Sequence, residues 1–379
     1  MFGWEWEDFE DLMQSYHASI VDAGPLKVPV RTFDLRRDAK LGLRLVVRSP
    51  QDAAGGTGPP PVATVRFNTD KVSFSSNLGL EVVAEGVDVE RENTKIHGDP
   101  ALGELVQDCR VHRLVGSLYP KDRPVAFVID WLDNLDPVFL WPDNITTSSS
   151  SERKVVLGIG VDSITMRGSS DPGGSGRRCV HLVVDGQSLF LCCADRPASD
   201  RQSKRGYIAY QGNPSHDFRD RVRRCLSFAL GLYLVYLGKT AFDSDWHTVG
   251  FEAISPYSLG GRALELPPTP PGPLGARYEW EIDGAMLSRV VNSVFSQYEN
   301  LNFGVVSWAY WHALAATPHI AGAHFGAAIE SLERAFLKTT NLKLKRTLLP
   351  DADWEILHQV LESALSARKF PPDVATILS

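Results

Sequence analysis

The feature that most constrains this 379-residue chain is a change in the period of its apolar residues near Asp217. Between residues 27 and 211, short apolar stretches alternate with polar residues, which is the pattern of strands that bury one face. Residues 155–162 show this most clearly, with a large apolar side chain at every second position. After Asp217 the apolar residues recur with the 3.6-residue period of helices. We therefore expect an α+β protein with a β-rich first half and a helical last part.

Residues 180–191 predict a β-hairpin. Two apolar runs flank Asp185-Gly186, and this dipeptide accepts the positive φ angles that a two-residue turn needs. Turn-rich breaks separate many further strand candidates, a spacing typical of a sandwich or an irregular barrel. These candidates are residues 42–49, 62–68, 71–76, 112–119, 125–131 and 138–141.

The second half predicts a series of helices that form a bundle. The first runs from Asp217 to a stop at Gly238, and the others cover residues 284–300, 303–317, 319–338 and a segment from 351 onward. Residues 319–338 place an apolar stripe on one helical face, as the core of a bundle requires. The stripe consists of Phe325, Ile329, Leu332 and Phe336.

Length and pattern together favour two domains, because a single core rarely serves more than about 250–300 residues. We expect a β-rich recognition or sensor domain over residues 1–215 and a helical domain over residues 216–379. A proline-rich segment over residues 266–274 is expected to form a stiff polyproline II connector.

Charge, cysteine usage and missing motifs exclude several classes of protein. A net charge of −7 excludes a nucleic-acid footprint over the whole surface, so only a local basic patch could serve. The five cysteines contain no C-x-x-C pair, which predicts small buried residues rather than a zinc or redox motif. No G-x-S-x-G, P-loop or G-x-G-x-x-G sequence occurs, which disfavours serine hydrolases, P-loop NTPases and Rossmann dehydrogenases.

The N-terminus and the longest apolar run bear on location. The acidic N-terminal stretch lacks the basic region of a signal peptide, and residues 226–237 form too short an apolar run to span a membrane comfortably. We therefore expect a cytoplasmic protein that does not contact a membrane. We assign it no cofactor and no metal ion.

Two groups of basic residues are candidates for nucleic-acid binding, one before and within the first predicted helix and one near residue 345. Their cationic groups could contact phosphates, with Tyr207 or Tyr210 available to stack on bases. The alternative is that these charges are solvated and serve no ligand. The candidates are Arg201, Lys204, Arg205, Arg219, Arg223, Lys343, Lys345 and Arg346.

The last helices carry a resemblance to a known family. The residues concerned are 310–313, 324–330 and Leu332-Glu333. With the β-rich part before them, they resemble bacterial proteins of the ApeA type, in which a β domain precedes a HEPN-like helical domain. The resemblance implies a HEPN-like bundle, and some proteins of this type are antiviral and cut RNA.

The catalytic residues of HEPN ribonucleases are an Arg followed four to six residues later by a His. The Arg holds the phosphate while the His assists proton transfer. No such pair occurs in the helical part, because Arg346 lies twelve residues before His358. Arg91 and His97 match the spacing, but they lie in the β-rich part. The resemblance therefore implies the scaffold and leaves open whether the chain is an enzyme.

A second candidate site has the spacing of a metal-dependent nuclease. Pro142-Asp143 is followed by Glu152-Arg153-Lys154, which fits the PD-(D/E)xK pattern. In such sites the two carboxylates bind Mg²⁺ and the lysine positions the attacking water. The halves would meet if residues 138–141 paired with residues 154–160 in a hairpin. The alternative is that these are solvated charges of a turn.

We expect a recognition and scaffold protein in which the β domain senses a ligand and the helical domain binds a partner, with a role in defence against phage. Wide apolar helix faces with Trp308, Trp311 and Phe325 favour a homodimer. Two alternatives stay open. One is a HEPN-type RNA endonuclease of an abortive-infection system, and the other is a Mg²⁺-dependent nuclease that uses Asp143, Glu152 and Lys154.

Overall fold

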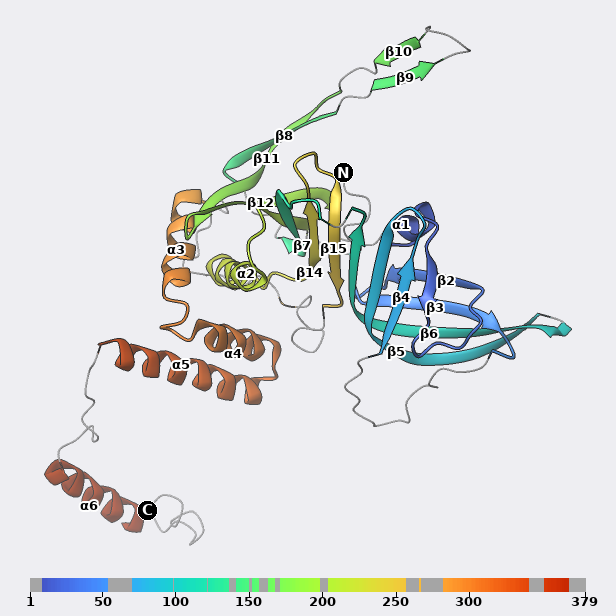
Figure 1. The fold of residues 1–379 in the computed structure, drawn as a ribbon. Coiled ribbons are helices and arrows are strands. Elements are labelled where there is room, and N and C mark those ends of the chain that lie inside the picture. Colours follow the sequence, from blue (N-terminus) through green and yellow to red (C-terminus); the bar gives the residue numbers. More distant parts are fainter. Residues whose placement is uncertain are drawn as a thin grey trace.

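The computed structural model describes most of the chain, and its centre is a large antiparallel sheet with helices that lie mostly in the second half (Figure 1). The strand candidates 62–68 and 138–140 and the connector residues 267–274 lie outside the described residues. The residues described are 9–53, 70–97, 99–120, 122–135, 141–149, 152–156, 163–167, 171–197, 204–256, 266, 282–340 and 351–367.

The β-rich first half is confirmed, and its strands join one continuous sheet of 13 strands with a separate two-stranded ribbon, β9 with β10. The main path runs β1-β4-β5-β6-β15-β14-β7-β13-β12-β11-β8. Off this path, β3 pairs with β6, and β2 pairs with β3. The strands are β1 Ser19–Asp22, β2 Thr32–Arg37, β3 Leu43–Pro50, β4 Lys71–Ser75, β5 Leu80–His97, β6 Asp99–Leu118, β7 Phe127–Leu135, β8 Asp143–Ser149, β9 Glu152–Val156, β10 Ser163–Arg167, β11 Asp171–Val184, β12 Gln187–Pro197, β13 Lys204–Gln211, β14 Tyr236–Phe242 and β15 Thr248–Ile254.

Strand β6 joins two lobes of the sheet, because its 20 residues pair with three other strands. On one side of it, β1 to β5 and helix α1 (Phe9–Ser15) enclose a core that includes Leu45, Phe74 and Val111. On the other side, β7 and β11 to β15 form the second lobe, on which the later helices pack.

The predicted hairpin is confirmed. Strands β11 and β12 pair from Cys179 with Cys192 to Val184 with Gln187, and Asp185 and Gly186 form the turn. Both turn residues have positive φ, 48° and 77°, as this turn requires. Side chains at alternate positions, including Leu182, Leu189 and Leu191, enter the core of the second lobe.

The first predicted helix is shorter than expected. Helix α2 spans His216–Leu230, where Gly231 adopts the left-handed conformation at φ 63° and caps the helix end. Residues 236–238, predicted as the end of this helix, begin strand β14 (Tyr236–Phe242) instead. Hydrophobicity alone does not distinguish a short buried strand from a helix segment, and here sheet pairing decides the outcome. The sheet therefore extends past Asp217 into the part assigned to the helical domain.

The other predicted helices are present within a few residues of their expected bounds. They are α3 Gly284–Ser296, α4 Phe303–Ala315, α5 Pro318–Thr340 and α6 Asp351–Ala367. Helices α2 and α3 pack on the second lobe through Leu226, Leu287 and Val291. Helix α4 places Trp311 edge-on to Tyr233, with 5.5 Å between ring centroids.

The expected bundle core on α5 is wrong for the described residues. Phe325, Ile329, Leu332 and Phe336 are 37 to 58% exposed, and the buried residues of α5 are Ala328 and Ala335. The reason is that α4 covers only the neighbouring strip of small residues. Helix α6 lies apart from α5 (Figure 1), and its described side chains are exposed except that of His358, which is partly buried.

The cysteines behave as predicted. All five are free and buried. Burial raises the pKa of Cys109 and of Cys225 to about 12, so these two thiols stay protonated at neutral pH. In the described part of the chain, no helix has the length and apolar character needed to cross a membrane.

The end of α2 generates a stability prediction. Gly231→Ala should lower the free energy of unfolding by about 1–2 kcal/mol, because a Cβ atom disfavours the left-handed conformation. Gly322→Ala is the matched control, since Gly322 lies inside α5 with open space around the position of a Cβ atom. That change should raise the free energy by about 0.5–1 kcal/mol. Urea unfolding measures both, and equal effects would contradict the proposed helix end.

Candidate functional site

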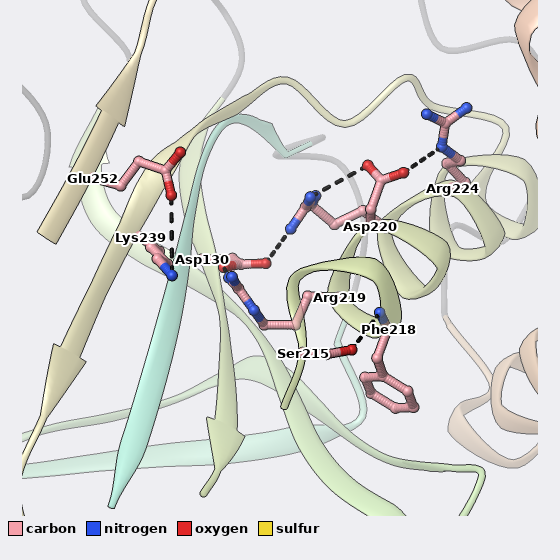
Figure 2. A network of polar contacts seen from close by, with 9 residues as sticks. Asp130, Ser215, Phe218, Arg219, Asp220, Arg224, Lys239 and Glu252 are labelled. Atoms are coloured by element: carbon pink, nitrogen blue, oxygen red, sulfur yellow. Dashed lines mark hydrogen bonds and ion pairs between the residues drawn. The ribbon is translucent and has the colours of Figure 1, made fainter. Parts of the chain in front are cut away.

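A buried carboxylate holds helix α2 on the sheet. Asp130 lies on the central strand β7 and is fully buried. Arg219 and Arg223, one helical turn apart on α2, each donate from Nη1 to one oxygen of Asp130. The i, i+4 spacing places both guanidinium groups on the same helix face, so one carboxylate receives both (Figure 2).

The charged chain continues from the interior toward the surface. Arg223 Nη2 lies 3.3 Å from Asp220 Oδ1, and Arg224 Nε donates to Asp220 Oδ2 at 2.7 Å (Figure 2). The guanidinium of Arg223 also lies over the ring of Tyr236, 3.9 Å from its centroid. Burial lowers the pKa of Arg223, but the charge of Asp130 and nearby groups raises it by more, so Arg223 stays charged.

A second carboxylate, Glu252 on β15, lies close to this network. Its Oε1 accepts a hydrogen bond of 2.7 Å from Arg113 Nε, and Lys239 Nζ lies 4.0 Å from its Oε2. Burial lowers the pKa of Lys239, and the positive charge of Arg219 lowers it further. The floor of the site is thus a set of charges of both signs, fixed on α2, β7, β14 and β15.

Above this floor lies a cleft of about 440 Å³ between α2, the strands β14 and β15, and α4. Helix α2 contributes the polar side, with Asp220, Arg223 and Arg224. Helix α4 contributes an aromatic side, where the ring of Trp308 stacks on His312 with 4.0 Å between centroids and 29° between planes. The cleft therefore offers cationic hydrogen-bond donors and flat rings to the same occupant.

The cleft has the groups of a binding site. Trp308 is 50% exposed, and Arg224 is partly exposed, so both can touch a ligand. Ser227 accepts a hydrogen bond from the Leu234 amide, and His312 Nδ1 lies 2.7 Å from the Trp308 carbonyl oxygen. Among the described lining residues, no serine is hydrogen-bonded to a histidine, which is the arrangement that nucleophilic catalysis needs.

The basic candidates from the sequence take different places. Arg219, Arg223 and Arg205 are 1 to 5% exposed, and Arg205 Nε lies 3.8 Å from Asp133. This corrects their interpretation as a surface for nucleic acid, because their charges are directed into the protein and paired there. Lys204 begins strand β13, and its side chain lies outside the described residues. The other candidates outside the described residues are Arg201, Lys343, Lys345 and Arg346.

The nuclease-like residues are not brought together. Asp143 begins β8, which pairs with β11, whereas Glu152 and Lys154 lie on β9, which pairs with β10. Glu152 follows the far end of β8, and a strand of that length spans about 20 Å. The expected hairpin between residues 138–141 and 154–160 is therefore not the pairing of β9, and Asp143 Oδ2 instead accepts the His181 amide at 2.9 Å.

Arg91 and His97 lie on the same strand, β5, opposite Asp108 and Asp99 of β6. Six residues of extended chain separate their backbones by about 20 Å. At this separation Arg91 and His97 cannot act together on one phosphate group.

A metal-ligand candidate lies in the turn between β14 and β15. Ligand atoms of Asp243, Asp245 and His247 lie within 4.8 Å of one another. The amides of Asp245 and His247 donate to Asp243 Oδ1, and Arg123 donates to its Oδ2 at 3.0 Å. Burial opposes ionisation of Asp243, but these donors outweigh it and lower its pKa. The arrangement is that of an Asp-stabilised turn.

Sequence reasoning missed the cleft. One sequence signal could have indicated it. Arg219 and Arg223 lie on the same helix as a run of apolar residues, and cations next to an apolar helix face need buried carboxylate partners. The partner, Asp130, is 89 residues from Arg219, and no local pattern indicates it.

The central carboxylate gives a prediction of large effect. Asp130→Asn should destabilise the protein by roughly 3–5 kcal/mol, because it leaves Arg219 buried without a counter-charge and Arg223 with Asp220 alone. Asp220→Asn is the control on the exposed end of the same network, and it should cost about 0–1 kcal/mol. Urea unfolding at pH 7 compares the two, and similar losses would contradict the central role of Asp130.

Comparisons with known proteins were made at three levels. No protein-family model matches the sequence, and neither a curated protein nor a solved structure was found to be similar to it. The function therefore has to be argued from the structure.

Proposed function

We propose that the protein is a recognition and assembly protein that self-associates through its last two helices, with a role in defence against phage. The observation that supports this is the pair of exposed apolar faces on α5 and α6, which we name the C-terminal apolar faces. On α5 the face consists of Phe325, Ile329, Leu332 and Phe336, and on α6 of Trp354, Ile356, Leu357, Val360 and Leu361.

These faces are larger than isolated apolar residues on a surface. Contiguous exposed apolar patches mark interaction sites on monomeric proteins. Complete burial of one such side chain contributes about 1.5–3 kcal/mol, so several of them can offset the entropy cost of association.

The widths of the two faces favour a second copy as the partner. At 100° per residue, the stripe on α5 covers an arc of about 60°, whereas the apolar residues of α6 cover about 160°. The α5 stripe fits a single neighbouring helix, but the α6 face has room for two. Two copies of the α5–α6 pair would cover both faces in a four-helix bundle.

In this proposal the β-rich lobes carry recognition. The ApeA-type resemblance supports such a division, with a β part that senses and a helical part that assembles. The alternative of a HEPN-type RNA endonuclease has less support, because the described helices contain no Arg and His at the family's spacing. Metal-independent cleavage of labelled RNA by the purified protein would favour that alternative.

The oligomeric state tests the proposal. The full chain should be a dimer by size-exclusion chromatography with light scattering, and Ile329→Glu or Leu361→Glu should weaken the dimer at least tenfold by burying a charge in the interface. Leu78→Glu is the matched control, since Leu78 is an exposed leucine, 61% accessible, between β4 and β5. A wild-type monomer at all concentrations, or equal effects of all three changes, would refute it.

A further inference from the structure

We propose that the cleft between α2 and α4 binds a nucleoside monophosphate, with the phosphate on Arg224 and the base against Trp308. This site lies apart from the C-terminal apolar faces and does not depend on self-association. The proposal rests on three features of the cleft: an oriented cation, a buried hydroxyl without a partner and an exposed aromatic surface.

Arg224 is the oriented cation. Its Nε is fixed by Asp220 at 2.7 Å, and Figure 2 shows its two terminal nitrogens directed away from that carboxylate. The guanidinium is therefore held in place while its Nη groups remain available, and this planar pair of donors matches two oxygens of a phosphate.

The charges around the cleft leave Arg224 as the donor for an anion. Among the charged lining residues, Arg223 and Arg224 balance Asp220 and Glu252. Arg223 is paired with Asp130 and Glu252 with Arg113, whereas Arg224 pairs with Asp220 through its Nε. An anion in the cleft is therefore expected to contact the Nη groups of Arg224.

Tyr236 supplies a donor without a partner. Its hydroxyl oxygen is buried at the lining of the cleft, and it makes no hydrogen bond among the described residues. Burial raises the pKa of this phenol, so it keeps its proton at neutral pH. A buried polar group without a partner destabilises the empty site, and a hydrogen bond to a phosphate oxygen would satisfy it.

Trp308 supplies the surface for a ring. It is 50% exposed at the mouth of the cleft, and its position is set by the stack on His312 and by the edge-on contact with His324 of α5, 5.6 Å between centroids. Nucleic-acid bases of every type stack on aromatic side chains, because each base has a flat π face. The tryptophan is thus both accessible and held in one orientation.

The size of the cleft agrees with a small ligand, because about 440 Å³ falls within the range of about 300–1,000 Å³ that is usual for such sites. Inorganic phosphate would use Arg224 and leave Trp308 without a contact. A nucleoside without phosphate would use Trp308 and leave the Nη groups of Arg224 without a ligand. A nucleoside monophosphate uses both ends.

Isothermal titration calorimetry on the full chain tests this. AMP and UMP should bind in a saturable way, and adenosine and inorganic phosphate should each bind at least tenfold more weakly. Arg224→Gln and Trp308→Ala should each weaken AMP binding at least tenfold, and Tyr236→Phe should weaken it several-fold. Arg334→Gln is the matched control, because Arg334 is an exposed arginine of α5 and, like Arg224, has a carboxylate partner four residues before it, here Glu330. AMP binding should not change in this variant.

Several outcomes would overturn the proposal. These are no saturable binding of either mononucleotide, phosphate binding as tight as that of AMP, or variants in the cleft that bind like Arg334→Gln. If a single-stranded oligonucleotide bound more tightly than AMP, the ligand of the cleft would be a nucleic-acid strand and the proposed mononucleotide would be wrong. Circular dichroism checks each variant for folding, and if Arg224→Gln unfolds, the half-exposed Trp308→Ala decides the matter.

Discussion

The contact of Asp130 with Arg219 and Arg223 is the interaction on which the second half of the structure depends. It fixes the rotation of α2 on the sheet, since both arginines must face strand β7. With that rotation set, Val222 and Leu226 enter the core, while Asp220 and Arg224 turn toward the cleft. A buried carboxylate shared by two cations allows little freedom of position, because any shift leaves a charge unpaired in a medium of low dielectric.

The continuity of the sheet explains how two parts of the chain act as one body. Strand β6 pairs with β3 and β5 in the first lobe and with β15 in the second. Strand β15 is the last of the described strands along the chain and follows α2, yet it pairs with β6 from the first half. Along the chain, helix α2 lies between β13 and β14, which both pair with β7, so the sheet holds α2 at both ends in addition to its ion pairs.

The sequence predicted the features that depend on residues close together in the chain, and it missed those that depend on distant residues. The hairpin around Asp185 was predictable because its turn residues and alternating strands are neighbours in the chain. The end of α2 was not predictable, since the apolar run continues to Leu237 and only pairing with β7 and β15 makes residues 236–242 a strand. The partner of Arg219 and Arg223 is Asp130, about 90 positions away in the chain. These two arginines therefore looked solvated in the sequence although they are buried. The stripe on α5 was identified correctly as apolar, but its burial depends on which helix covers it.

Helix α4 has two working sides. One side presents Trp308 and His312 to the cleft, and the other packs Val306 and Ala309 against Ala328 of α5. The two helices also meet through rings, because Trp308 lies edge-on to His324 of α5 at 5.6 Å between centroids, and Tyr310 lies edge-on to Phe325 at 6.3 Å. The lining of the cleft and the support of the α5 stripe thus share one helix of 13 residues, and a change that unwinds α4 would remove both together.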